Sequence, residues 1–500
     1  MGSRLFVFLL CMAHLLIDNY SIDKSNQHPE MSREPAIEEN NFDEDDSLFL
    51  NPLSPANVEK DPEYRPRDSL ASIRSSIKKE SPTSRGMMTF IKSLIGTGVL
   101  ALPFVINSVG LVPAWILLFI VGYLNLYTMK LVDSAASDVG AIRTDLGKLS
   151  QLITGRKWFR YFAEGNLYIM QVGCVIAGLV FIAKYLESVS CILGWNFMCG
   201  HKAVQFALIL AFVLPIMTIT DLHYLAIPNA IALVFQLLFC LVFFTISFGL
   251  LSYQGAANGG LRASLSRWDF SNFPVAFATI LYAYEGIGLL LEVRSSVAES
   301  SKFNKVLDWS FVVSTISYLL FGTVGALVYG DATQPIIFLN LDQTDKFIVF
   351  VEFMYLIAII LGIPSALFPV TRMIENLKVF RKCIVDETGK KRKIARQIIR
   401  LPLFLFLCGI AVVIPSFNSF LSFLGGFNFS ILAFVVPVIL YYVRFKSEKS
   451  QKLKLIFNWL LLVVGVILGI TASVQSIIDM AQDNSIPPSL ANPYANTTSL

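Results

Sequence analysis

Long apolar segments recur from Met87 almost to the end of the chain, and this repetition constrains the fold more than any other feature. A helix needs about 20 predominantly apolar residues to cross the hydrocarbon core of a bilayer. Apolar segments of about that length alternate with polar connections, and each is expected to form a transmembrane helix. The eleven predicted helices are residues 87–108, 111–132, 161–188, 203–219, 224–250, 273–297, 306–329, 346–370, 399–415, 418–443 and 454–477.

The composition excludes most soluble classes of protein. Charged residues make up 15% of the chain, against about 25% in soluble domains, so too few remain to cover a water-exposed surface. The net charge of +4 gives no basic field for nucleic acid. The seven cysteines form no CxxC pair, and the four histidines lie in tails or connections. We therefore expect an all-α polytopic membrane protein that is not an enzyme and binds no metal or organic cofactor.

The segment before the first span, residues 1–86, is polar and contains an acidic stretch at 38–46. Such a composition cannot bury enough apolar surface to order itself, so we expect a disordered cytoplasmic tail that could bind a cytosolic partner. One apolar run within residues 1–30 is too short to span a membrane. It could be a secretory signal, a surface helix or an extension upstream of Met31.

The distribution of lysine and arginine predicts the orientation. With the N-terminal tail inside, the inner connections carry 23 of these residues and the outer ones carry 4, as the positive-inside rule requires. Residues 478–500 then lie outside the cell or in a lumen, where Asn496 begins an N-glycosylation pattern. Cys191 and Cys199 share one outer connection, where a disulfide and two free thiols are both plausible.

Two of the predicted spans contain a glycine pair at mid-length. The first has Gly-Thr-Gly at 96–98, and the sixth has Glu-Gly-Ile-Gly at 285–288. Each glycine weakens a helix by about 1 kcal/mol relative to alanine, and lipid cannot satisfy the backbone groups that a break frees. Small residues could instead serve close helix packing. Paired breaks five spans apart, however, indicate two inverted halves, helices 1–5 and 6–10, around a transporter binding site.

The chemistry of such a site suits a zwitterion. A half-helix that begins at a break presents free N–H groups and a positive dipole end to a carboxylate. A half-helix that ends there presents carbonyls to an ammonium group. Gln171 on the third span and a hydroxyl beside Pro364 on the eighth are further candidates. The predicted substrate-binding residues are Gly96, Thr97, Gly98, Tyr282, Tyr284, Gly286, Gln171 and Ser365.

Glu285 is the most informative single residue, because a carboxylate at the bilayer centre costs about 3 kcal/mol on insertion scales. It could carry a coupling proton, hold the substrate amine or bond to freed backbone N–H groups. A sodium site would need several oxygen ligands, and the eighth span offers Ser365 without a second hydroxyl nearby. We therefore favour protons over sodium as the coupling ion.

Four motifs resemble the amino acid/auxin permease family. Residues 96–103 resemble its first helix, and residues 284–288 resemble the Phe-Glu-Gly-Ile-Gly of its sixth, with Tyr284 in place of the commoner phenylalanine. Residues 328–333 are similar to its Tyr-Gly-Asp/Glu-x-Thr segment, and residues 414–417 to the loop that precedes its tenth helix.

The resemblance covers about residues 87–477, the expected membrane domain, and looks closest to the proton-coupled and vacuolar amino acid transporters. It implies a LeuT-like five-plus-five inverted repeat of about eleven helices with helices 1 and 6 broken. It also implies transport of small neutral amino acids with protons, in a plasma membrane or a lysosomal or vacuolar membrane. No histidine follows the first helix, where some proton-coupled members have one. A sodium-coupled symporter and an amino acid sensor that signals through the tail remain alternatives.

Overall fold

The computed structural model contains only helices and connections among the residues that it describes. These are residues 87, 90–91, 94–141, 144–195, 197–217, 222–254, 268–296, 300–375 and 389–485. The predicted tail 1–86 and the glycosylation site at Asn496 lie outside them.

The longer helices correspond to most of the predicted spans. They are α5 (Leu111–Asp138), α7 (Lys157–Ile192), α8 (Lys202–Met217), α9 (Leu222–Gln254), α13 (Ser300–Tyr329), α14 (Lys346–Glu375), α16 (Gly389–Val413) and α19 (Lys452–Ser485). Shorter elements make up the rest: η3 (Thr97–Ala101), α4 (Leu102–Val109), α6 (Leu146–Thr154), α11 (Phe273–Ala283), α12 (Ile287–Ser296), α17 (Phe417–Leu424) and α18 (Val436–Phe445).

The described helices confirm a polytopic membrane protein. Eight of them are long and apolar enough to cross a bilayer, and shorter apolar helices lie at Thr97–Val109, Val204–Val213 and Arg400–Val413. Each of the eleven predicted segments is therefore helical. The number of spans itself stays a prediction, because it counts the three short helices as spans.

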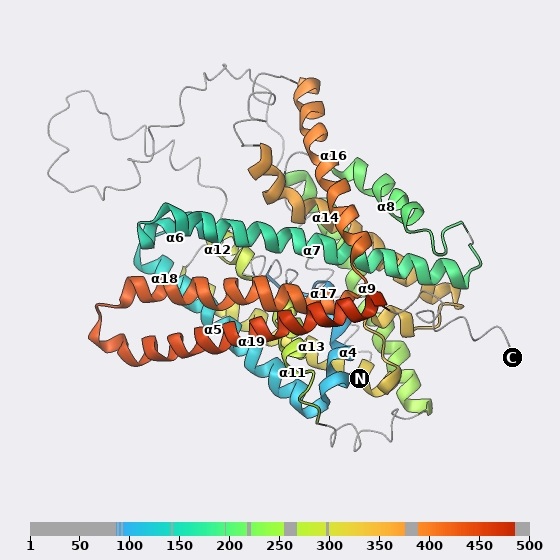
Figure 1. Ribbon diagram of the computed structural model, residues 1–500, viewed down its shortest axis with the longest axis horizontal. Coiled ribbons are helices and arrows are strands. Elements are labelled where there is room, and N and C mark those ends of the chain that lie inside the picture. The colour runs from blue at the N-terminus through green and yellow to red at the C-terminus, as the bar shows by residue number, and fades with distance from the viewer. Residues whose placement is uncertain are drawn as a thin grey trace. The chain divides into compact units, whose positions relative to one another are not determined.

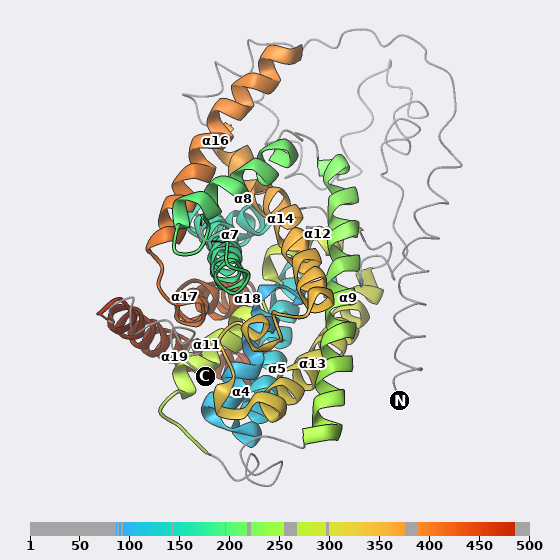
Figure 2. The same ribbon diagram turned by 90° about the vertical axis from the view of Figure 1, so that its right-hand side faces the viewer.

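The helices pack in two main groups, which Figures 1 and 2 show from two sides. In one group, η3, α4, α5, α11 and α13 pack against one another; in the other, α14 packs on α9 and α7, and α7 packs on α8 and α16. Both α17 and α19 pack on α11. The buried apolar side chains form one main cluster that extends across these helices, so the two broken spans lie in the interior.

One helix of the structure was not predicted. α6 lies in the connection between the second and third predicted spans. Asp145 caps its start by accepting from the Lys148 N–H at 2.7 Å, and Gly155 ends it with a left-handed φ of 68°. Both residues are ordinary helix-boundary signals, but the connection is too polar to register in a search for membrane spans.

The tenth predicted span, 418–443, is helical but not uniform. Between α17 and α18 the backbone widens into π-helical turns at η6 (Gly425–Phe429) and η7 (Ile431–Val435). Gly425 lies so close to α11 that a Cβ there would overlap the Ala278 carbonyl oxygen. The glycine therefore allows α11 to approach this segment, a constraint that the sequence pattern does not reveal.

A buried ion pair joins α12 to α5. Arg294 donates from Nε to Asp133 Oδ1 at 2.5 Å and from its other nitrogens to the Ala141 carbonyl and the Ser137 hydroxyl. The two charged side chains are 4% and 6% exposed. Arg294 is one of the 23 lysines and arginines that the sequence analysis assigned to the inner connections. Its charge is neutralised by Asp133 inside the protein.

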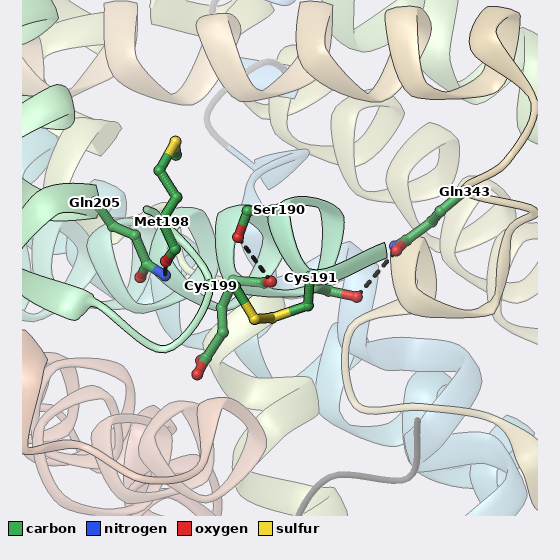
Figure 3. The surroundings of a disulfide bond; sticks show 8 residues. Ser190, Cys191, Met198, Cys199, Gln205 and Gln343 are labelled. Atoms are coloured by element: carbon green, nitrogen blue, oxygen red, sulfur yellow. Dashed lines mark hydrogen bonds between the residues drawn. A yellow bond between two sulfur atoms is a disulfide. The ribbon is translucent and has the colours of Figure 1, made fainter. Parts of the chain in front are cut away.

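A disulfide joins Cys191 at the end of α7 to Cys199 in the connection that follows (Figure 3). Gln205 of α8 donates to the Met198 carbonyl at 3.0 Å and holds the same connection. Of the two alternatives for these cysteines, the structure therefore has the disulfide. It lies in a connection that the charge bias puts outside, where oxidising conditions allow such bonds.

Candidate functional site

The two broken spans meet in the interior of the protein. The first span is interrupted at residues 95–96 before η3 begins, and the sixth is interrupted between the end of α11 at Ala283 and the start of α12 at Ile287. A Cβ on Gly98 would lie 2.9 Å from the Ala283 Cα, so the two backbones are in direct contact there. Both predicted breaks are thus confirmed, and the fold brings them together.

A hydrogen bond between side chains also connects the two breaks. Thr97 Oγ1 and the Tyr282 hydroxyl are 3.1 Å apart. Cys174 of α7 lies beside the same tyrosine hydroxyl, a neighbour that the sequence analysis missed. At Gly96, by contrast, no atom of the described residues lies within 4 Å of the position that a Cβ would take.

The carbonyls that the breaks free are covered by polar side chains from neighbouring helices. The Tyr318 hydroxyl on α13 lies 2.5 Å from the Leu94 carbonyl oxygen and 2.7 Å from that of Ala283. Asn125 on α5 donates to the Tyr284 carbonyl at 2.6 Å. One hydroxyl carries one hydrogen, and each carbonyl has two lone pairs. The Leu94 carbonyl also accepts from the Gly96 N–H at 3.0 Å, so of these two carbonyls it is that of Ala283 that retains capacity to accept from a further donor.

The sequence analysis also missed Tyr318 and Asn125. Asn125 had a detectable signal, because it is a polar residue in the middle of the second predicted span, where an amide without a partner is costly. Tyr318 had none, because a tyrosine in an apolar helix is common and its contact with both breaks is a product of the fold.

Glu285 accepts a hydrogen bond from the Gly288 N–H at 3.1 Å and so caps the first turn of α12. A carboxylate at this position satisfies a free backbone donor and faces the positive end of the helix. Three roles were left open for Glu285: to carry a coupling proton, to hold the substrate amine or to bond to freed backbone N–H groups. The structure contains the last of these, the bond to a freed N–H group.

Gln171 of α7 approaches the second break near Gly288. A Cβ on Gly288 would lie 3.5 Å from Glu285 Oε1 and 3.7 Å from Gln171 Nε2. Two polar side chains, one from α7 and one from the second break, therefore approach the same point. The Met170 Cε lies nearer still, 2.7 Å from that position, so the absence of a side chain at Gly288 makes room for Met170.

Tyr284 and Gly286 face a different part of the protein. The Tyr284 hydroxyl donates to Thr315 Oγ1 at 2.8 Å, and its ring stacks on Phe311 of α13. A Cβ on Gly286 would lie 2.9 Å from Phe90. Both residues thus pack the second break against its neighbours, away from the Thr97–Tyr282 hydrogen bond.

Ser365 lies apart from this group. Its hydroxyl is hydrogen-bonded to Asn229 of α9, with Oγ 2.8 Å from Nδ2 and 3.2 Å from Oδ1. The structure therefore brings together Gly98, Thr97, Tyr282, Glu285 and Gln171 but holds Ser365 at the contact between α9 and α14. No cluster of metal-binding side chains occurs within the described part of the chain.

These features define a polytopic helical membrane protein with a paired-break site of the kind that secondary transporters use. Residues 79–478 match the family described as "Transmembrane amino acid transporter protein". The chain belongs to this family, and its resemblance to the amino acid/auxin permeases is confirmed.

Two curated relatives illustrate the similarity. The chain is 29% identical over 316 residues to "Vacuolar amino acid transporter 4" of Saccharomyces cerevisiae, covering 62% of this chain and 43% of that protein. It is 28% identical over 360 residues to "Amino acid transporter ANT1" of Arabidopsis thaliana, covering 69% of this chain and 81% of that protein. The chain thus spans less than half the length of the yeast relative and most of the plant one.

Among solved structures, the chain is similar to the crystal structure of MhsT in complex with L-phenylalanine. The match has 13% sequence identity and a TM-score of 0.46, covering 80% of this chain and 99% of that one. A match at that TM-score supports no statement about the fold of this chain. The inverted repeat therefore stays a prediction, and it rests on the paired breaks.

Proposed function

We propose that this chain is a secondary active transporter of small neutral amino acids that works by alternating access and is driven by protons. One observation carries the proposal: the two breaks are in backbone contact at Gly98 and Ala283, inside the helix packing and beside a carboxylate. Membership of the transmembrane amino acid transporter family supports amino acids as the substrate class.

The site offers complementary groups to both charges of an amino acid. The N–H groups at the start of η3 and the open space beside Gly96 suit the carboxylate. The Ala283 carbonyl, which shares the Tyr318 hydroxyl hydrogen with Leu94, suits the ammonium group. Because the backbone supplies these groups, no fixed charged side chain is needed, which favours neutral amino acids over basic or acidic ones.

The arrangement of side-chain oxygens near the site favours protons over sodium as the driving ion. Glu285 lies at the second break and can exchange a proton with the site. A sodium ion would require a set of oxygen ligands there, and Ser365, the candidate hydroxyl on α14, is hydrogen-bonded to Asn229 instead. The relatives named for vacuolar transport favour a vacuolar or lysosomal membrane over the plasma membrane, with the N-terminus in the cytoplasm.

The test is uptake of a panel of labelled neutral amino acids into proteoliposomes without sodium, with and without an inward proton gradient. We expect accumulation only with the gradient. Each pH unit provides about 1.4 kcal/mol and thus about tenfold accumulation for a one-proton symporter. Accumulation that requires sodium instead of a proton gradient would transfer the coupling to sodium.

The acidic tail favours one alternative, an amino acid sensor of the same fold with little flux. Deletion of residues 1–86 separates the two hypotheses, because a transporter should still carry substrate without its tail. Binding of amino acids without accumulation under any ion gradient would favour the sensor.

A further inference from the structure

A second carboxylate lies inside the helix packing, well apart in the sequence from the two breaks. Glu352 is on α14, about 9 Å along the helix from its first residue, Lys346, and its side chain is fully buried, at 0% exposure. Its Oε2 accepts a hydrogen bond from the Tyr185 hydroxyl of α7 at 3.0 Å. Its Oε1 has no hydrogen-bond partner among the described residues.

The surroundings of Glu352 contain no compensating charge in the described part of the chain. A phenol, Tyr329 at the end of α13, is close enough to interact with it electrostatically, and the Tyr329 hydroxyl is also buried without a partner. Tyr355 lies one turn further along α14, where it interacts with Cys240 of α9. All of these groups are neutral near pH 7 in their ordinary forms.

The charged groups of the nearby helices lie elsewhere. Lys184 and Glu187 of α7 line a separate cavity with residues of α8 and α16. On α16, Arg396 and Arg400 pair with Glu375, near the opposite end of α14 from Glu352. An ionised Glu352 would therefore be a buried charge with a single neutral donor, which is strongly unfavourable. Protonation of Oε1 removes that charge.

Tyr185 connects Glu352 to the segment between α13 and α14. That segment contains η4 (Gly330–Ala332) and η5 (Ile337–Asn340). Phe338 of η5 is fully buried, and its ring makes an edge contact with Tyr185 at 5.6 Å between centroids. A change in the Tyr185–Glu352 hydrogen bond is thus transmitted directly to the packing of this connection.

We propose that Glu352 is a second proton-binding site of this chain, distinct from Glu285, whose protonation from the outer side sets how firmly Tyr185 holds the connection between α13 and α14. The proposal rests on the proposed transport function and on the orientation from the charge bias, by which Lys346 and the start of α14 face outward. Loss of the charge on Glu352 weakens a charge-assisted hydrogen bond to Tyr185, which frees the connection to move during the transport cycle.

The experiment compares the full-length protein with Glu352→Gln in proteoliposomes, measuring initial uptake of a transported amino acid at a series of external pH values. Glutamine keeps the shape of the side chain and can accept from Tyr185, but it binds no proton. We expect the wild-type rate to rise as the external pH falls, and the variant rate to lose part of this dependence, so that its acid-to-neutral ratio is smaller than that of the wild type but stays above one because Glu285 still binds protons. Glu187→Gln, a carboxylate of the neighbouring cavity, is the matched control and should keep the wild-type profile.

Two further measurements distinguish this proton site from a structural role. Tyr185→Phe removes the hydrogen bond through which the charge on Glu352 acts on the connection, so its uptake should lose the same part of the pH dependence as that of Glu352→Gln. Infrared difference spectra between acidic and neutral pH should contain a carboxylic acid carbonyl band in the wild type that is lost in Glu352→Gln. An unchanged pH profile in both variants, or an unchanged band, overturns the proposal.

The outcomes also separate this proposal from the proposed function. If the wild type carries no amino acid under any gradient, the transport proposal fails, while the infrared band still tests proton binding at Glu352. If the wild type transports with a pH dependence that Glu352→Gln leaves intact, the second proton site alone fails. If Glu352→Gln does not fold, the profile of Tyr185→Phe decides, because that variant keeps the carboxyl.

Discussion

The contact between the two breaks gives the sharpest prediction, the effect of replacing Gly98 with alanine. The added Cβ would lie 2.9 Å from the Ala283 Cα and 3.1 Å from the Ala283 Cβ. Carbon atoms prefer separations of about 3.5–4.0 Å, so the two breaks must move apart by roughly 0.6–1.1 Å. The nearest atom belongs to the backbone, and no change of rotamer can relieve the overlap.

The expected cost follows from two opposing effects. Overpacking in a closely packed interior costs about 1–3 kcal/mol. Alanine lowers the conformational entropy of the unfolded chain and recovers about 0.4–1 kcal/mol, because Gly98 is not among the glycines with positive φ. We expect a net destabilisation of about 1–2 kcal/mol. Apparent substrate affinity should fall at least about tenfold, because the breaks no longer keep their spacing.

Gly96→Ala is the matched control. Gly96 has an extended conformation, with φ of −112°, and a Cβ there meets nothing within 4 Å. This variant should unfold at the wild-type temperature yet bind substrate more weakly, because its methyl group occupies the space beside the break. The assay is thermal unfolding of both variants in detergent, together with uptake at varied substrate concentration. If Gly98→Ala unfolds and transports like the wild type, the close approach is not needed and the reasoning about the site is wrong.

Four other substitutions test separate parts of the structure. Glu285→Gln should fold but lose pH-driven accumulation in proteoliposomes, since an amide can cap α12 yet carry no proton; unchanged accumulation would remove this residue from coupling. Tyr318→Phe removes the hydrogen that two break carbonyls share and should destabilise the protein by about 1–3 kcal/mol in thermal unfolding; an unaltered unfolding temperature would mean that other donors suffice. Arg294→Met leaves Asp133 buried without its cation and should cost about 3–5 kcal/mol, part of which Asp133→Asn should restore in the double variant. Cys191→Ser frees one thiol, and labelling by an impermeant reagent should increase over the wild type only when the reagent is applied from the outer side; an increase from the inner side would reverse the predicted orientation.

Much of the membrane architecture was predictable because it follows from local sequence. A span requires a long apolar run, and the segments proposed on that basis are all helical in the structure. The interruptions at 96–98 and 285–288 were predictable for the same reason, since glycine weakens a helix wherever it lies. The α6 helix was missed because its capping residues, Asp145 and Gly155, lie in a polar connection.

The site itself was only partly predictable. Thr97 and Tyr282 are hydrogen-bonded, and Gln171 lies close to Glu285, as expected of residues around one site. The nomination of Ser365 rested on its hydroxyl and a neighbouring proline, and neither reveals that Asn229 of another helix bonds to it. Tyr284 belongs to the right motif, but its side chain points into the packing with α13.

The sequence by itself determined that this chain is a polytopic helical membrane protein and that its first and sixth spans are broken. It also determined the family to which the chain belongs. These properties depend on apolar length, on glycine and on motifs, all of which are local. Only the tertiary structure decided that Tyr318 serves both breaks and that Glu352 meets Tyr185. The Tyr318–Leu94 and Glu352–Tyr185 contacts join residues more than 150 positions apart. They depend on how each helix is rotated about its axis, which the sequence does not specify where a membrane helix is apolar on every side.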